Sequence, residues 1–261
     1  MTQRSLLAIS LAVLTVGACA QTTPKTSLLA LSKQDHTLAI VDPADLHIVA
    51  RIPVGDDPHE VVASADGATA YVSNYGFGAF HTLAVIDLLG KRQVKFIDLG
   101  ALRGPHGLDF KQGKVWFTAE AAKAIGSYDP ATDKIDWIMG TGQNRTHMVY
   151  VFPDAKRILT TNVSSATLSI LDRTEGRAGG PPPGMPPNAQ SPGGPGDPPS
   201  GIRLGMPPGG MPGPFGGDWQ QTVIPVGRGS EGFDVSPDGA EAWVANAGDG
   251  SISVVNLTAK K

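Results

Sequence analysis

Three histidines and one glutamate begin similar stretches of the sequence and have the chemistry to form a site together. They are His59, His106, His147 and Glu231. His106 lies 47 residues after His59, His147 lies 41 residues after His106, and Glu231 lies 84 residues after His147. Neutral imidazoles and a carboxylate are suitable ligands for a divalent metal, and they are also suitable general acids or bases near neutral pH. The set therefore predicts a metal or ligand site, with His106, His147 and Glu231 as the candidates for catalysis.

Arginines precede three of these four residues. Arg103, Arg145 and Arg228 each lie two or three positions before a member of the set. Three guanidiniums around one site would favour an anionic ligand such as a carboxylate or a phosphate. Taken singly, each arginine also fits a solvated loop. If the three act together, we expect a small anionic ligand; the alternative is a protein or peptide partner.

Two further candidates for ligand binding follow apolar stretches in the middle of these units. They are Asn74 and Glu120. The loop that begins at Asn74, with the sequence NYGFGAFH, is the longest and most aromatic of its kind and could form a wall or lid. Because asparagine also suits the turn after a strand, a structural role for Asn74 stays open.

The elements that must position these residues repeat along the chain. Each unit has an apolar strand, a polar turn, a second strand with a small or polar end, and a third strand that ends in an acidic or amide residue. Without a Gly/Pro-rich tract at about 176–217, the last spacing falls to about 42 residues. A period in the low forties with four short strands per unit is typical of β-propeller blades. The four candidates would then lie at the heads of the inner strands, around the mouth of the central channel.

The strand count predicts an incomplete ring. The chain opens with three strands that lack an inner strand, continues with three complete units, and closes with three strands that lack an outer one. This gives about eighteen strands, or about 4.5 four-stranded antiparallel blades in an all-β fold. We expect a shortened member of a family with a larger ring; the alternative is a strained five-bladed ring with two incomplete blades. An open arc would expose strand edges and an apolar face.

The repeated strands resemble those of the YVTN family of β-propellers. The resemblance rests on AYVSN, ILTTN and AWVAN, which are followed by LAVID, LSILD and ISVVN. It covers nearly all of the chain apart from the N-terminal segment and the Gly/Pro-rich tract. It implies the fold more than the function, because propellers serve as binding modules, scaffolds and enzymes.

One unit also resembles a blade of the streptogramin lyase (virginiamycin B lyase) family. That resemblance implies a divalent metal with histidine from PHG turns and glutamate from WFTE strand ends. His106 matches the PHG position, and His59, in PHE, matches it in part. Glu120 follows WFTA and is displaced by one residue from the WFTE position. The departure puts lyase activity in doubt.

The first twenty residues predict export. Arg4 precedes an apolar stretch from Leu6 to Val16, which is too short for a comfortable bilayer span. The sequence VGAC ending at Cys19 resembles a bacterial lipobox, in which this cysteine is lipidated, whereas ACA at 18–20 fits ordinary signal peptidase. We therefore expect a periplasmic protein with an N-terminal lipid anchor, or a soluble periplasmic or secreted protein.

Composition limits the remaining possibilities. The net charge is −3 without a long run of one sign, so no nucleic-acid partner is expected. We assign 1–20 to a signal peptide, 27–174 and 218–258 to propeller blades, and 175–217 to a disordered insertion that is too rich in Gly and Pro to fold. Two functions stay open. One is a binding or scaffold module with a ligand or metal at the channel mouth, and the other is a metal-assisted lyase or lactonase at the same mouth.

Overall fold

The computed structural model describes residues 26–174 and 219–261, which form five antiparallel sheets. The predicted signal peptide, Cys19 and the whole Gly/Pro-rich tract lie outside the described residues. Three central sheets have four strands each, and the first and last have three, so the eighteen strands confirm the predicted count. The sheets are numbered here as blades 1 to 5 in chain order. No helix of the described part is long and apolar enough to span a membrane.

Within each blade the strands are hydrogen-bonded in chain order, from the inner edge to the outer edge. The strands of blades 1 and 2 are β1 (Leu28–Ser32), β2 (Thr37–Val41), β3 (Ile48–Pro53), β4 (Pro58–Ala63), β5 (Thr69–Asn74), β6 (Thr82–Asp87) and β7 (Arg92–Asp98). Those of blades 3 and 4 are β8 (Pro105–Lys111), β9 (Lys114–Ala119), β10 (Ala124–Asp129), β11 (Lys134–Gly140), β12 (Thr146–Val151), β13 (Arg157–Asn162), β14 (Thr167–Arg173) and β15 (Trp219–Pro225). Blade 5 contains β16 (Ser230–Val235), β17 (Glu241–Asn246) and β18 (Ser251–Asn256). Two 3-10 turns, η1 (Gly76–Gly78) and η2 (Val163–Ser165), follow β5 and β13.

The burial of each strand follows its place in the blade. The middle strands β5, β9 and β13 are buried on both faces after their first residue, because a blade has a neighbour on each side. The outer strands β7 and β11 alternate between exposed and partly buried residues, as expected for strands with one face in water. Four hydrophobic clusters fill the boundaries between successive blades. The core is therefore divided into layers, one at each boundary.

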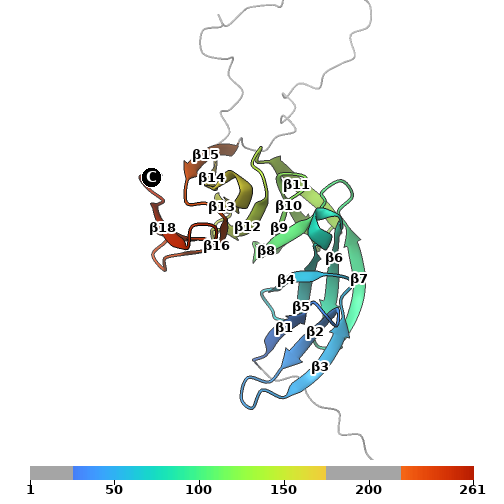
Figure 1. The fold of residues 1–261 in the computed structure, drawn as a ribbon. Helices are drawn as coiled ribbons and strands as arrows, with labels where there is room; N and C mark the ends of the chain where they lie inside the picture. The colour runs from blue at the N-terminus through green and yellow to red at the C-terminus, as the bar shows by residue number, and fades with distance from the viewer. Residues whose placement is uncertain (1–25, 175–218) are drawn as a thin grey trace, which may run out of the picture.

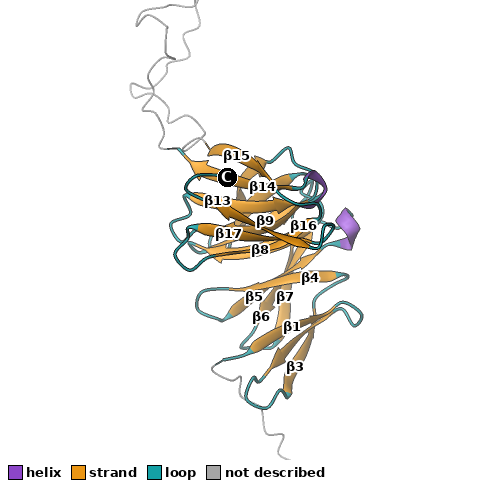
Figure 2. Ribbon diagram, turned by 60° about the vertical axis from the view of Figure 1, so that its left-hand side comes forward, coloured by secondary structure: helices purple, strands orange, loops and turns teal. Residues whose placement is uncertain are grey.

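The blades form an open arc (Figure 1), with blade 1 at one end and blade 5 at the other. The same separation of β1 and β3 from β17 is seen in Figure 2. The inner strands β4, β8, β12 and β16 contact one another in that order. Blade 1 lacks an inner strand and blade 5 lacks an outer strand among the described residues, as the sequence predicts. The structure thus confirms an incomplete propeller. The blades do not close into the strained five-bladed ring.

Candidate functional site

The predicted site residues occupy one repeated position of the inner strands. His59, His106, His147 and Glu231 are each the second residue of β4, β8, β12 or β16. At this point every inner strand has a register shift against its neighbour, which extends over the two residues after the first. Such an irregularity redirects side chains locally. It gives these four residues a common backbone setting.

A turn in the left-handed region comes just before each inner strand. The residues there are Asp57, Gly104, Arg145 and Gly229, with φ between 45° and 69°. The carbonyl of each accepts a hydrogen bond of 2.8–3.1 Å from the N–H of the residue that follows the second strand of the same blade. This bond holds the residue after the second strand close to the head of the inner strand.

Hydroxyl side chains connect these heads from blade to blade. Thr118 Oγ1 accepts a hydrogen bond from the Gly107 N–H at 2.9 Å and donates one to the His147 carbonyl at 2.5 Å. Ser73 joins the N–H of Glu60 to the carbonyl of His106 in the same way. Thr161 repeats the arrangement, because its hydroxyl accepts a hydrogen bond from the Met148 N–H and donates one to the Glu231 carbonyl. The Ser or Thr near the end of the second strand in blades 2 to 4 therefore positions the site residue of the following blade.

A second repeated position supplies the partners of the histidines. It is the residue directly after the second strand of a complete blade, which is Tyr75 in blade 2 and Glu120 in blade 3. In blade 1, which lacks an inner strand, β1 takes the place of the second strand and the equivalent residue is Lys33. Each of these residues lies beside the histidine of the next blade. Lys33 Nζ is 2.7 Å from His59 Nδ1, the Tyr75 ring centroid is 5.1 Å from that of His106, and Glu120 Oε1 is 2.5 Å from His147 Nδ1.

The three histidines form one cluster with His106 in the middle. Its ring centroid is 4.0 Å from that of His59 and 3.8 Å from that of His147. Tyr75 packs against both His59 and His106 and donates a hydrogen bond to Glu120, so it forms a wall of the cluster as the sequence suggests for its loop. One ligand atom each of His106, Glu120 and His147 lies within 4.8 Å of the others. All three residues are buried.

Burial and the neighbouring charges keep His106 neutral. The side chain is only 3% exposed, and burial together with the positive charge of its neighbours lowers its pKa to about 2. Its Nδ1 is buried and has no hydrogen-bond partner among the described residues. An uncharged imidazole with an unsatisfied buried nitrogen is suited to bind a metal ion.

Glu120 stays ionised in spite of its burial. Burial is the strongest influence and raises its pKa, but hydrogen bonds from His147 and Tyr75 and the charges of His147 and Arg145 outweigh it, so the pKa is lowered. Burial and the bond to this carboxylate raise the pKa of Tyr75 to about 12. The tyrosine therefore keeps its proton, and its hydroxyl donates a hydrogen bond to Glu120.

The hydrogen-bond partners determine which ring nitrogen carries the proton in two of the histidines. An ammonium group only donates, so the bond from Lys33 makes His59 Nδ1 an acceptor and places the proton on Nε2. An ionised carboxylate only accepts, so Glu120 requires a proton on His147 Nδ1 and leaves the Nε2 lone pair available. A carboxylate that orients a histidine in this way is common around protein metal sites.

Only one of the three predicted arginines contacts the cluster. Arg145 Nε is 3.5 Å from Glu120 Oε2. Arg103 instead donates to the carbonyl of Ala79, and Arg228 forms an ion pair of 2.7 Å with Asp249. The expected triplet of guanidiniums is therefore reduced to a single cation, because the other two are held by their own loops.

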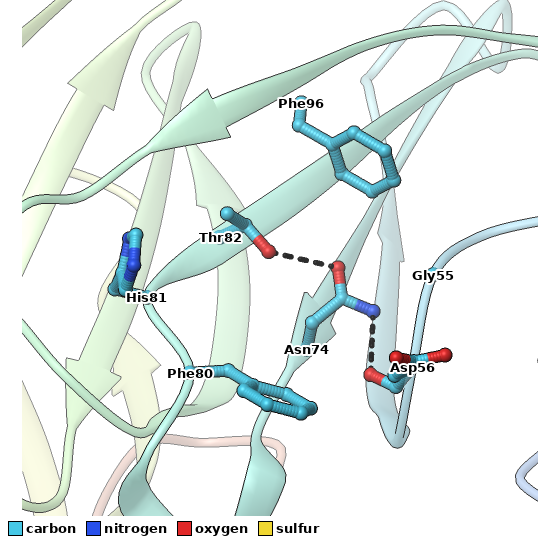
Figure 3. A pocket seen from close by; sticks show the side chains of 7 residues that line it. All are labelled: Gly55, Asp56, Asn74, Phe80, His81, Thr82 and Phe96. Carbon is cyan, nitrogen blue, oxygen red and sulfur yellow. Dashed lines mark hydrogen bonds between the residues drawn. The ribbon is translucent and has the colours of Figure 1, made fainter.

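Glu231 and Asn74 lie outside the cluster. Glu231 is exposed, and its neighbour after the second strand of blade 4 is the apolar Val163. Asn74 is 2% exposed and donates to the carbonyls of Val54 and Asp56, while Thr82 donates to its amide oxygen. The structure thus favours the structural alternative for Asn74, which Figure 3 shows between Thr82 and Asp56.

A separate cavity of about 360 Å³ opens on blade 2, away from the histidines. It is lined by Phe80, Phe96, His81 and Asn74, among others (Figure 3). His81 is paired with Asp98 at 2.8 Å. No buried polar atom without a partner points into this cavity among the described residues.

Two residues near the cluster are absent from the sequence-based predictions. Lys33 binds His59, and Glu60 is a partly buried carboxyl group whose pKa is raised by burial. Aligning the incomplete first unit with the others would have identified Lys33, because it occupies the same position as Tyr75 and Glu120. Glu60 gives no signal in the repeat, since the equivalent residues are Gly107, Met148 and Gly232.

Comparisons with known proteins identify the fold. No protein-family profile and no curated protein matches this sequence. Hydrazine synthase of Kuenenia stuttgartiensis aligns with a TM-score of 0.52 and 14% identity, over 90% of this chain and 75% of that chain. The dihydro-heme d1 dehydrogenase NirN in complex with DHE aligns with a TM-score of 0.58 and 14% identity, over 92% of this chain and 43% of that one. Both neighbours are β-propellers, and at this identity the likeness shows that the present chain is a β-propeller module.

Proposed function

We propose that this chain is a binding module that holds a divalent metal ion at His106, Glu120 and His147. The observation that carries the proposal is that three buried residues each place one ligand atom within 4.8 Å of the others. Two histidines and one carboxylate form a ligand set that suits zinc and related divalent ions. His106 Nδ1 is buried without a hydrogen-bond partner among the described residues, and the bond between His147 Nδ1 and Glu120 leaves Nε2 as the available nitrogen of His147.

The surroundings favour an anion as a further ligand of this metal. Lys33 and Arg145 place two positive charges on opposite sides of the cluster, and both side chains are about half exposed. With a divalent ion present, the positive charges around the cluster would exceed the negative charges of Glu120 and Asp57. We propose a small carboxylate or phosphate as the ligand that approaches from solvent.

A second candidate function is a metal-assisted lyase or lactonase at the same cluster. One observation favours it: His59 carries its proton on Nε2, lies against His106, and has a side chain that is 23% exposed. Such a histidine is positioned to donate a proton to a molecule bound at the metal. The enzyme would be favoured over the binding module if the metal-loaded protein hydrolyses a lactone or forms an unsaturated product by elimination. This activity should be lost in His59→Gln.

We also propose that the chain works outside the cytoplasm. Support comes from Arg4, the apolar stretch that follows and the lipobox-like sequence at Cys19. Labelling with a radioactive fatty acid in a bacterial host, with Cys19→Ser as the control, separates a lipid anchor from a soluble product.

Metal content tests the proposed function directly. Purified protein, stripped of metal and incubated with Zn²⁺ or Mn²⁺, should retain one ion per chain by elemental analysis, and His106→Ala/His147→Ala should retain none. Asp45→Asn is the matched control, because Asp42, Asp45 and His47 form a second, exposed group that could hold an ion. One ion per chain retained by the double variant would contradict the proposal.

A further inference from the structure

The two end blades of the arc each present one sheet face without a neighbouring blade among the described residues. In the other blades, one face packs on the preceding blade and the other face packs on the following blade. The repeat allows residues at the same position to be compared between blades.

The face of blade 5 that points away from blade 4 repeats the chemistry of the blade boundaries. Ile252 has the same position as Leu38, Leu83, Ile125 and Leu168, which are all 0% exposed, yet it is 64% exposed. On the same face, Trp243 is 49% and Val254 is 48% exposed. Their counterparts in blade 4, Leu159 and Ile170, are 0% exposed. This apolar face therefore matches surfaces that are otherwise covered by a blade.

The face of blade 1 at the opposite end of the arc shows the complementary deviation. Leu28 has the position of Ala70, Val115, Ile158 and Ala242, which are all 0% exposed because each faces the preceding blade. Leu28 itself is 51% exposed. Ala30, Ala39 and Val41 lie on the same face of the sheet. Ala39 and Val41 are only 5% and 8% exposed, so the open part of this receiving surface lies around Leu28.

We propose that copies of this chain associate head to tail, with the open face of blade 5 of one copy packed on the open face of blade 1 of another. Such a contact would continue the same boundary that joins each pair of blades within the chain. It would cover Trp243, Ile252 and Val254 on one side and Leu28 on the other. Exposed apolar patches of this kind commonly mark protein interfaces.

The charges on the two faces are opposite. Exposed Arg51 lies on the blade 1 face, because it pairs with Ala39 across β2 and β3. Asp234 lies on the blade 5 face, because it pairs with Trp243, and Glu241 lies there as well, since it accepts a hydrogen bond from Trp243 Nε1. Opposite charges favour contact between the two different faces over contact of either face with itself.

The two faces differ, so the contact is heterologous and either closes into a ring or extends into longer assemblies. Sedimentation velocity of the full chain over a range of concentrations should show dimers or larger species. Ile252→Lys should raise the self-association Kd roughly tenfold or more. Ile138→Lys is the matched control, because Ile138 is 56% exposed but lies on the outer strand of blade 3. Circular dichroism verifies that both variants fold.

A mixing experiment tests whether the two faces meet each other. Ile252→Lys keeps an intact blade 1 face, and Leu28→Glu keeps an intact blade 5 face, so each variant alone should be monomeric. Their equimolar mixture should form a complex that stops at two chains. A monomeric parent at all concentrations, a dimer that survives Ile252→Lys, or a mixture that stays monomeric would each overturn the proposal.

Discussion

Nδ1 of His147 lies 2.5 Å from Oε1 of Glu120, and this contact joins two repeat positions across the boundary between blades 3 and 4. The carboxylate also accepts a hydrogen bond from Tyr75 and lies 3.5 Å from Arg145. It is therefore the point at which the side chains from three blades are joined. The candidate site depends on how accurately these blades are stacked.

Replacement of this carboxylate tests its role in orienting His147. Glu120→Gln should weaken the binding of Zn²⁺ by about 10- to 100-fold, because the amide is a poorer ligand and a poorer acceptor for His147 Nδ1. Isothermal titration calorimetry measures the affinity. Glu231→Gln should bind as tightly as the parent, since Glu231 is exposed and lies outside the cluster. Equal affinities in all three proteins would exclude Glu120 from the site.

The hydroxyl that connects blades 3 and 4 should affect both stability and binding. Thr118→Val removes the acceptor for the Gly107 N–H and the donor to the His147 carbonyl, both of which are buried. Leaving such groups unpaired costs about 1–3 kcal/mol each. Urea unfolding measures this loss, and calorimetry should show weaker metal binding as well.

Thr161→Val is the control for that variant. It removes the acceptor for the Met148 N–H and the donor to the Glu231 carbonyl, so only one of its two partners lies next to a proposed ligand, and both bonds are only partly buried. We expect a smaller loss of stability and a smaller loss of metal affinity than for Thr118→Val. An equal loss of affinity in both variants would show that Thr118 acts only through overall stability.

The close approach of the inner strands predicts a sharp difference between two equivalent glycines. A Cβ atom on Gly107 would lie 2.6 Å from the His147 carbonyl oxygen and 2.7 Å from Met148 Cα. At Gly232, the same position of blade 5, it would meet nothing within 4 Å among the described residues. Gly107→Ala should therefore lower the thermal midpoint or prevent folding, whereas Gly232→Ala should be neutral or stabilise by up to about 1 kcal/mol. Differential scanning calorimetry compares them, and equal midpoints would disprove the close contact.

The neutral state of His106 should make stability depend on pH. The pKa of its imidazole is about 2 in the folded chain, against 6.5 for an unperturbed histidine, so below pH 6.5 the unfolded chain binds the additional proton. The free energy of unfolding should then fall as the pH falls. From pH 7 to pH 5, the free energy of unfolding of the parent should fall by about 2 kcal/mol more than that of His106→Gln. Urea unfolding at several pH values measures it, with the exposed His81→Gln as control.

The sequence predicts the features of the fold and the site that follow from the repeat. The period placed His59, His106 and His147 at one strand position, and the strand count predicted an incomplete ring. It failed for Glu231 and for two of the arginines, because a shared position does not fix which local partner a flexible side chain selects. Arg228 is bound by Asp249, and Glu231 lies where the second repeat position is occupied by the apolar Val163. The sequence pattern does not indicate Lys33, because this residue belongs to the incomplete first unit.

Within a single unassociated chain, a row of blades in which each one contacts only its neighbours behaves as a one-dimensional array, whose two ends are held on one side only. Local opening should therefore begin in blades 1 and 5 and progress inward. The histidine cluster spans blades 2 to 4, but the proposed ligands His106, Glu120 and His147 belong to blades 3 and 4, so an ion bound there would strengthen the boundary between these two blades without touching either end. Ligand binding would then protect the centre of the array from hydrogen exchange and leave the fraying of its ends unchanged.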